Sequence, residues 1–149
     1  MDNQRQITDG DIEFIERAKL DFSFFVEFIF PLSFRTYTEP RHAIEWAKTI
    51  QYNKKTAMLS ARKHLKSTIM YAYVMWRIFK MQFSEKWMYM SYNDKMTRYH
   101  TKEIKYHNSL TPFFKGLKDL TYAESNLKYR WDGINVFSVL PTTISGCNR

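Results

Sequence analysis

The sequence predicts an α/β fold with a parallel sheet, and three observations support this. A short apolar run, a basic loop and a long apolar helix follow one another between Thr56 and Phe79. A second apolar run, Trp87–Ser91, leads into another helical stretch. Asp132-Gly133 lies between the predicted strands 127–131 and 134–140, which is a strong hairpin signal. Strands that alternate with helices favour a layered α/β architecture.

Size and composition favour a single ordered domain. The chain has 149 residues, of which 44% are hydrophobic and 17% aromatic, so it can bury a sizeable core. Its one cysteine, Cys147, excludes an internal disulfide. No apolar run approaches the length of a membrane span, and Met1-Asp2-Asn3-Gln4 does not begin a signal peptide. We therefore expect a cytoplasmic protein with no membrane partner.

The net charge of +8 is unevenly distributed. Residues 1–50 hold 6 Lys and Arg against 9 Asp and Glu, a balance of −3, whereas residues 51–149 hold 17 against 6, a balance of +11. A basic block of this size favours polyanions such as nucleotides, nucleic acid or an acidic membrane surface. An ordinary soluble basic surface has the same composition, so charge alone does not separate these interpretations.

The first 55 residues are predicted to be helical. Thr8-Asp9-Gly10-Asp11 supplies a side-chain cap and first-turn acids for a helix that ends near Leu20. Pro31 ends or kinks a second helix, and Pro40 fits the first turn of a third, which runs to Ile50. The second helix is predicted by apolar residues at i, i+3, i+4 and i+7, namely Phe22, Phe25, Val26 and Ile29.

The predicted strands lie in the rest of the chain. Residues 56–60 are apolar enough to form a buried first strand. The helix predicted over residues 66–81 carries apolar side chains on every side, so it should lie deep in the fold. Asn93 or the next residue caps a further helix over residues 94–110.

The loop between the first strand and the apolar helix has the order of a phosphate-binding loop. Backbone N–H groups at a helix start face an anion, and a Lys followed by a hydroxyl residue adds a charge for the outer phosphates and a ligand for Mg²⁺. Lys66 and Ser67 occupy those two places. The pattern G-x-x-x-x-G-K-[ST] is not met, since Ser60 replaces the first Gly and Leu65 the second. A branched side chain resists the positive φ that Gly supplies, so an ordinary strand–loop–helix corner is the alternative.

The segment Ser60-Ala61-Arg62-Lys63-His64-Leu65-Lys66-Ser67-Thr68 resembles the deviant Walker A loop of the large terminase subunit of tailed bacteriophages. In that family the loop commonly lacks the first Gly and carries an Arg four places before the Lys, as Arg62 stands before Lys66. The helix containing Trp76, the strand 87–91 and the basic helix that follows resemble the family in the same order, as does Thr111-Pro112-Phe113-Phe114. Leu65 departs from the family, in which Gly is usual.

The resemblance implies a P-loop NTPase-like three-layer sandwich that is partial here, with residues 1–55 as an N-terminal helical segment and residues 56–149 as the first part of the ATPase core. It implies that residues 60–68 bind ATP, with Lys66 on the β- and γ-phosphates, Ser67 on Mg²⁺ and Arg62 as an internal arginine finger. The implied partners are double-stranded DNA, the small terminase subunit and the portal protein, with self-association into a homo-oligomer. The implied setting is the cytoplasm of an infected bacterial host.

An ATPase also needs an acidic strand end that holds Mg²⁺ and orients water. None of the six acids after residue 51 closes a strand of four apolar residues. Gly146-Cys147-Asn148-Arg149 resembles the turn that precedes this strand in the family. We therefore expect the N-terminal part of an ATPase domain, without a visible Walker B acid or a nuclease domain, and with apolar sheet surface exposed. The acids are Glu85, Asp94, Glu103, Asp119, Glu124 and Asp132.

Four cations of the predicted helix 94–110 recur at i, i+3, i+7 and i+10, namely Lys95, Arg98, Lys102 and Lys105. This spacing places them along one stripe that fits a phosphate backbone, and a plain solvated face has the same pattern. The leading hypothesis is an ATP hydrolase of a DNA-packaging motor. The alternatives are a non-catalytic module derived from such an ATPase that binds nucleic acid or a protein partner, and a piece of a helicase-like ATPase.

Overall fold

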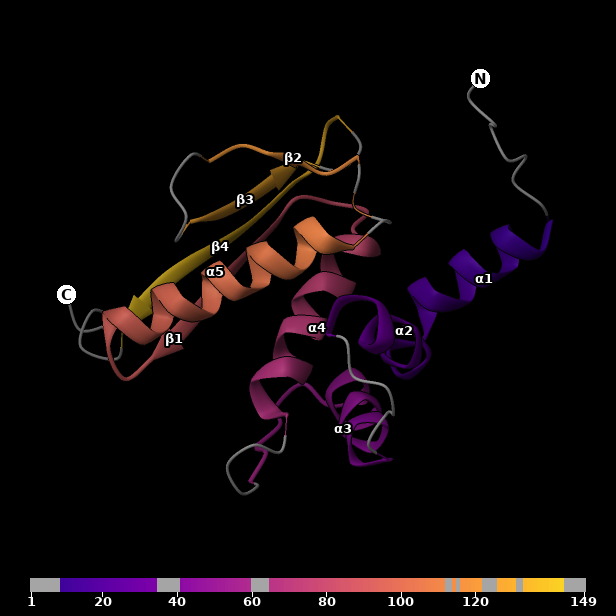
Figure 1. Cartoon of the computed structure of the whole chain (residues 1–149), viewed down its shortest axis with the longest axis horizontal. Helices are drawn as coiled ribbons and strands as arrows, with labels where there is room; N and C mark the ends of the chain where they lie inside the picture. Colours follow the sequence, from indigo (N-terminus) through magenta and orange to yellow (C-terminus); the bar gives the residue numbers. More distant parts are fainter. Residues whose placement is uncertain are drawn as a thin grey trace.

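In the computed structural model the chain is a mixed α/β protein, and its described residues form five α-helices and a four-stranded sheet (Figure 1). No helix in the described part of the chain is long and apolar enough to cross a membrane. The structure describes residues 9–34, 41–59, 65–111, 114, 116–121, 126–130 and 133–143. The elements are α1 (Asp9–Leu20), α2 (Phe22–Ile29), the π-helical turn η1 (Phe30–Phe34), α3 (Arg41–Tyr52), α4 (Lys66–Phe79), β1 (Glu85–Ser91), α5 (Asp94–Leu110), β2 (Lys118–Asp119), β3 (Leu127–Arg130) and β4 (Val136–Thr143).

The helices follow the predicted pattern closely. Asp21 caps α2 by accepting hydrogen bonds from the backbone N–H groups of Ser23 and Phe24. The helix ends at Ile29, and the chain continues into the π-helical turn that contains Pro31, which confirms the predicted interruption there. The predicted cap of α5 is also confirmed, because the Asn93 side chain accepts a hydrogen bond from a first-turn N–H group.

The four strands form one mixed sheet in the order β1-β4-β3-β2. β1 and β4 are parallel, as the expected parallel sheet requires, whereas the other two pairings are antiparallel and make the sheet mixed. The predicted hairpin is confirmed by β3 and β4, in which Leu127 lies opposite Val139. Gly133 in the connection has a φ of 82°, a left-handed conformation that glycine adopts without a steric penalty. β2 was not predicted, because its two residues carry no apolar pattern and it forms by backbone pairing with β3.

The predicted strand over residues 56–60 is wrong in its described part. Residues 56–59 form no strand, and the Leu59 side chain is 96% exposed, while Ser60 lies outside the described residues. Ala57 has low strand propensity, and none of the described strands pairs with this run. An apolar run becomes a strand only where a sheet edge is available, so the first strand of the sheet is β1 instead.

α4 is the central helix, as its all-round apolar pattern predicted. Figure 1 shows it between the N-terminal helices and the layer formed by α5 and the sheet. The Phe22 ring of α2 lies 5.0 Å from the Trp76 ring of α4, and the Trp76 indole donates a hydrogen bond to the Ala18 carbonyl at 2.9 Å. Its eight buried residues are Ile69, Tyr71, Ala72, Val74, Met75, Trp76, Ile78 and Phe79.

The two faces of the sheet differ in cover. α5 packs on one face, where Ile104 is fully buried and the Thr97 hydroxyl donates a hydrogen bond to the Thr142 carbonyl of β4 at 3.0 Å. On the other face Met88, Met90 and Leu140 are 56%, 53% and 60% exposed. The expected exposure of apolar sheet surface is therefore confirmed, and the described residues supply no second covering layer of a three-layer sandwich.

We expect Phe22→Ala to lower the free energy of unfolding by about 3–5 kcal/mol, because it leaves a cavity against Trp76 in the middle of the core. Urea denaturation followed by tryptophan fluorescence measures this. Leu20→Ala is the matched control, since Leu20 is 73% exposed and its truncation should change stability by no more than about 0.5 kcal/mol. Equal effects of the two substitutions would contradict the packing described.

Candidate functional site

α4 begins at a leucine with a left-handed backbone. Leu65 is the N-cap residue, with φ 60° and ψ 17°, and it is the one non-glycine residue of the described chain with a positive φ. This conformation costs an L-residue roughly 1–2 kcal/mol. Leu65 stands where the second Gly of a phosphate-binding loop belongs. The backbone therefore takes the turn that glycine normally provides, in spite of the branched side chain.

Packing explains how the leucine tolerates this turn. The Leu65 side chain is partly buried against the hydrophobic core, and its carbonyl accepts the first helical hydrogen bond, from the Ile69 N–H group at 2.9 Å. Its side chain makes no capping hydrogen bond to the first turn. Helix starts leave N–H groups without helical partners, and a non-polar cap residue does not satisfy them. The start of α4 therefore has the local chemistry that an anion would complement.

Three predicted site residues form the first turn of α4. Ser67 is exposed, whereas Lys66 and Thr68 are half-buried beside it. The other predicted ATP-binding residues, Ser60, Ala61, Arg62, Lys63 and His64, lie outside the described residues. Their roles, including that of Arg62 as an arginine finger, stay predictions.

A polar aromatic cluster that the sequence did not reveal lies one turn further along α4. The Tyr71 hydroxyl is hydrogen-bonded to Nδ1 of His100 on α5. Burial raises the pKa of Tyr71, and burial lowers the pKa of His100. The contact with His100 needed the tertiary packing.

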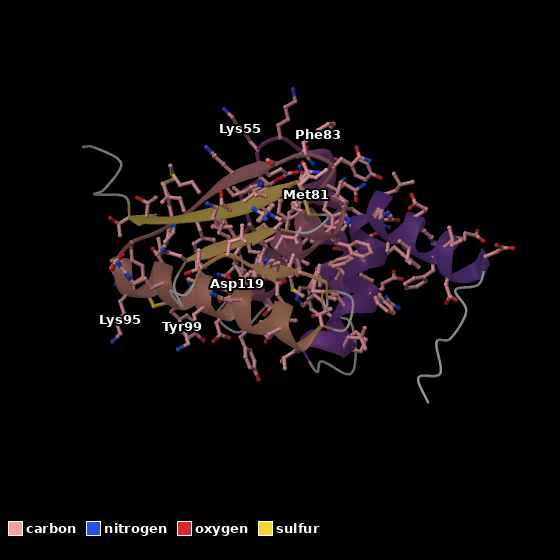
Figure 2. All side chains as sticks on the ribbon, turned by 90° about the horizontal axis from the view of Figure 1, so that it is seen from above. Lys55, Met81, Phe83, Lys95, Tyr99 and Asp119 are labelled. Carbon is pink, nitrogen blue, oxygen red and sulfur yellow. The ribbon has the colours of Figure 1, made fainter. Side chains whose placement is uncertain are left out.

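The predicted basic stripe is only partly available for phosphates. Figure 2 shows Lys95 pointing from α5 away from the sheet. Lys102 is also exposed. Arg98 forms an ion pair with Asp94 at 2.6 Å, and the Lys105 ammonium lies 2.6 Å from the Asp119 carboxylate. Arg98 and Lys105 thus already have acidic partners.

Two cavities are described, and α4 lines neither of them. One, of about 470 Å³, lies on the open face of the sheet and is lined by residues of β1, β3 and β4 and by the segment before β3. The other, of about 170 Å³, lies between α5 and the β2–β3 pair. The described residues contain no group of three His, Cys, Asp or Glu side chains placed to hold a metal ion.

Comparison of the chain with family models, with curated proteins and with solved structures finds no match. The fold and the site therefore define only the architecture. The chain is a mixed α/β protein, and its central helix begins at a left-handed leucine followed by Lys66 and Ser67.

Two substitutions of Leu65 separate the energetic cost of its positive φ from the loss of its side-chain contacts. Leu65→Gly and Leu65→Ala remove nearly the same apolar contacts, but only glycine accepts a positive φ without penalty. We expect the glycine variant to be the more stable of the two by about 1 kcal/mol in urea denaturation. At an ordinary helix start with negative φ the alanine variant would be at least as stable, and that result would contradict the left-handed turn.

The pair of Asp119 and Lys105 predicts a pH dependence. Burial acts to raise the Asp119 pKa, but hydrogen bonds from Lys105 and Thr121 outweigh it and leave the pKa below the ordinary value of 3.8. The folded protein therefore binds this proton more weakly than the unfolded chain does. The pair stabilises the fold above pH 3.8, and its contribution is lost as the pH falls through the lowered pKa.

We expect Asp119→Asn to lower the free energy of unfolding at pH 7 by about 1 kcal/mol or less, because the pair is partly exposed. The difference from wild type should shrink at pH 3, as measured by urea denaturation at both pH values. Asp94→Asn, at the exposed pair with Arg98, is the control and should change little. If Asp119→Asn lowers the free energy of unfolding equally at both pH values, the loss of stability does not come from the charge of Asp119.

Proposed function

We propose that the start of α4 binds the phosphates of a Mg²⁺-nucleotide, and that the chain is the first part of a P-loop-type ATPase of a DNA-packaging motor. The observation that carries the proposal is the left-handed Leu65 directly before Lys66 and Ser67. Strained non-glycine backbone persists where the surroundings enforce it, and it clusters at ligand-binding sites. The assignment to a DNA-packaging motor, and to DNA as its substrate, rests on the resemblance to the large terminase subunit.

Each described residue has a chemical task in this proposal. The Lys66 ammonium neutralises charge on the outer phosphates, and the backbone N–H groups of the first turn donate to phosphate oxygens along the helix dipole. The exposed Ser67 hydroxyl fits a Mg²⁺ site, because this ion takes one or two protein oxygens beside phosphates and waters. When bound, Mg²⁺ would neutralise charge on the transferring phosphoryl group. We also propose the three-layer sandwich of P-loop proteins, in which a second layer covers the sheet face that the described residues leave open.

A non-catalytic nucleic-acid-binding module is the second candidate. The balance of +11 over residues 51–149 favours it, together with the exposed Lys95 and Lys102 on α5. The ion pairs of Arg98 and Lys105 count against a continuous basic stripe, because binding a phosphate backbone would have to displace their acidic partners. Nucleotide binding is therefore the better-supported function.

Titration of a fluorescent ATP analogue with Mg²⁺ tests the proposal. We expect saturable binding to the wild type and at least about tenfold weaker binding to Lys66→Ala, because the charge on the outer phosphates is lost. Lys95→Ala is the matched control, since it removes an exposed lysine from another helix and should leave the affinity unchanged. Leu65→Gly should bind more tightly than wild type, because glycine lets the backbone approach the phosphates more closely.

Two outcomes would contradict the proposal. Equal nucleotide affinity of the Lys66→Ala and Lys95→Ala variants would show that the start of α4 is not the nucleotide-binding site. Absence of nucleotide binding, together with salt-dependent affinity for double-stranded DNA that falls in Lys95→Ala, would favour the nucleic-acid-binding module.

A further inference from the structure

The two faces of the sheet carry different charges. Successive residues of a strand point to opposite faces, and both strand acids lie on the face that the helices cover. There Glu85 pairs with Arg77 of α4, and Asp119 pairs with Lys105 of α5. The alternate positions form the open face, and none of the described strand residues on that face is acidic. The strand cations on the open face are Lys86, Lys118, Lys128 and Arg130.

The apolar part of the open face lies on the parallel pair β1–β4. Met88 is in register with Leu140, both side chains are more than half exposed, and both line the cavity of about 470 Å³. Parallel strands are normally covered on both faces, whereas here the described residues cover the side of α5 (Figure 2). Methionine adapts its shape to a partner and is common at binding surfaces. The open side of this pair therefore fits a further packed element.

Two lysines flank the apolar pair. Lys86 of β1 and Lys128 of β3 are both in register with Ser138 of β4, so they stand one strand to either side of it, and all three line the cavity. Both lysines are exposed, and neither forms an ion pair with a described residue. Neighbouring strands lie about 4.8 Å apart, so three strands are about 10 Å wide, close to the diameter of one helix. A helix lying over β4 therefore has one lysine at each flank.

The chemistry of the open face distinguishes between its possible occupants. Single-stranded nucleic acid binds sheet faces by stacking on aromatic side chains, and no strand position on the open face is aromatic. A second copy of the chain would bring two positively charged faces together, which costs free energy. An amphipathic helix with acidic flanks satisfies both the apolar centre and the lysines.

We propose that the open face docks an amphipathic helix of a partner protein, with an apolar stripe on Met88 and Leu140 and carboxylates on both flanks that pair with Lys86 and Lys128. The apolar stripe supplies most of the affinity, and the charges set the choice of partner and its orientation. The inference goes beyond the proposed function, because it rests on the sheet and not on nucleotide binding. It gives the chemistry of the helix that covers the open face.

A designed helix serves as the probe. It is a fluorescein-labelled peptide of about 18 residues, about 27 Å long, with one leucine stripe and glutamates on both flanks. We expect saturable binding to the wild type by fluorescence anisotropy, and at least about tenfold weaker binding to Lys86→Glu/Lys128→Glu, because like charges then meet. Lys48→Glu/Lys95→Glu is the matched control, since it reverses two exposed lysines of α3 and α5 and makes the same change in net charge.

Two further comparisons separate a lost contact from a misfolded variant. A peptide with lysines in place of the glutamates should bind Lys86→Glu/Lys128→Glu more tightly than the wild type, which an unfolded variant would not do. Leu140→Ser should weaken the binding of the acidic peptide about tenfold, because it removes apolar contact area. Leu20→Ser, at an exposed leucine of α1, should leave that binding unchanged.

The inference is overturned if the wild type does not bind the acidic peptide, or if the two double charge reversals weaken binding equally. Single-stranded DNA that binds in place of the peptide, and is lost in Lys86→Glu/Lys128→Glu, would assign the face to nucleic acid. A dimer in sedimentation that Leu140→Ser dissociates would assign it to a second copy of the chain. Lys66→Ala should bind the peptide as the wild type does, so this inference and the proposed nucleotide function fail separately.

Discussion

The burial of α4 is the interaction on which the rest of the structure depends. Trp76 connects it to the N-terminal helices through the Phe22 ring and the Ala18 carbonyl. Arg77 connects it to β1 through an ion pair with Glu85 at 2.7 Å. Each large apolar side chain that it buries contributes about 1.5–3 kcal/mol, so the helix is held along its whole length. Its start is consequently fixed relative to both the helical layer and the sheet.

This fixed position explains why a strained residue is tolerated at the helix start. Leu65 has a conformation that costs roughly 1–2 kcal/mol, yet its side chain packs against the core and its carbonyl begins the helix. Relaxing the turn would shift α4 against two packed layers, which costs more than the strain. The same rigidity places Tyr71 against His100, to which its hydroxyl is hydrogen-bonded.

The sheet has two chemically different sides. Beneath α5 it is packed and hydrogen-bonded, whereas Met88, Met90 and Leu140 lie exposed on the other side, where Met88 and Leu140 line the larger of the two described cavities. Exposed apolar area of this kind is usually covered in the working state of a protein. α5 shows the converse arrangement, because its inner residues are buried and its outer side carries Lys95 and Lys102.

The sequence by itself determined the elements whose signal is local. The period of apolar residues predicted α2 and α4, the cap at Asn93 predicted the start of α5, and the turn around Gly133 predicted the β3–β4 hairpin. These signals suffice because neighbouring residues generate them. Tertiary structure alone decided that residues 56–59 form no strand, that β1 pairs with β4, that Lys105 is bonded to Asp119, and that Tyr71 meets His100. Each of these depends on a partner distant in the chain, whose position follows from how the helices and strands pack and not from any local pattern.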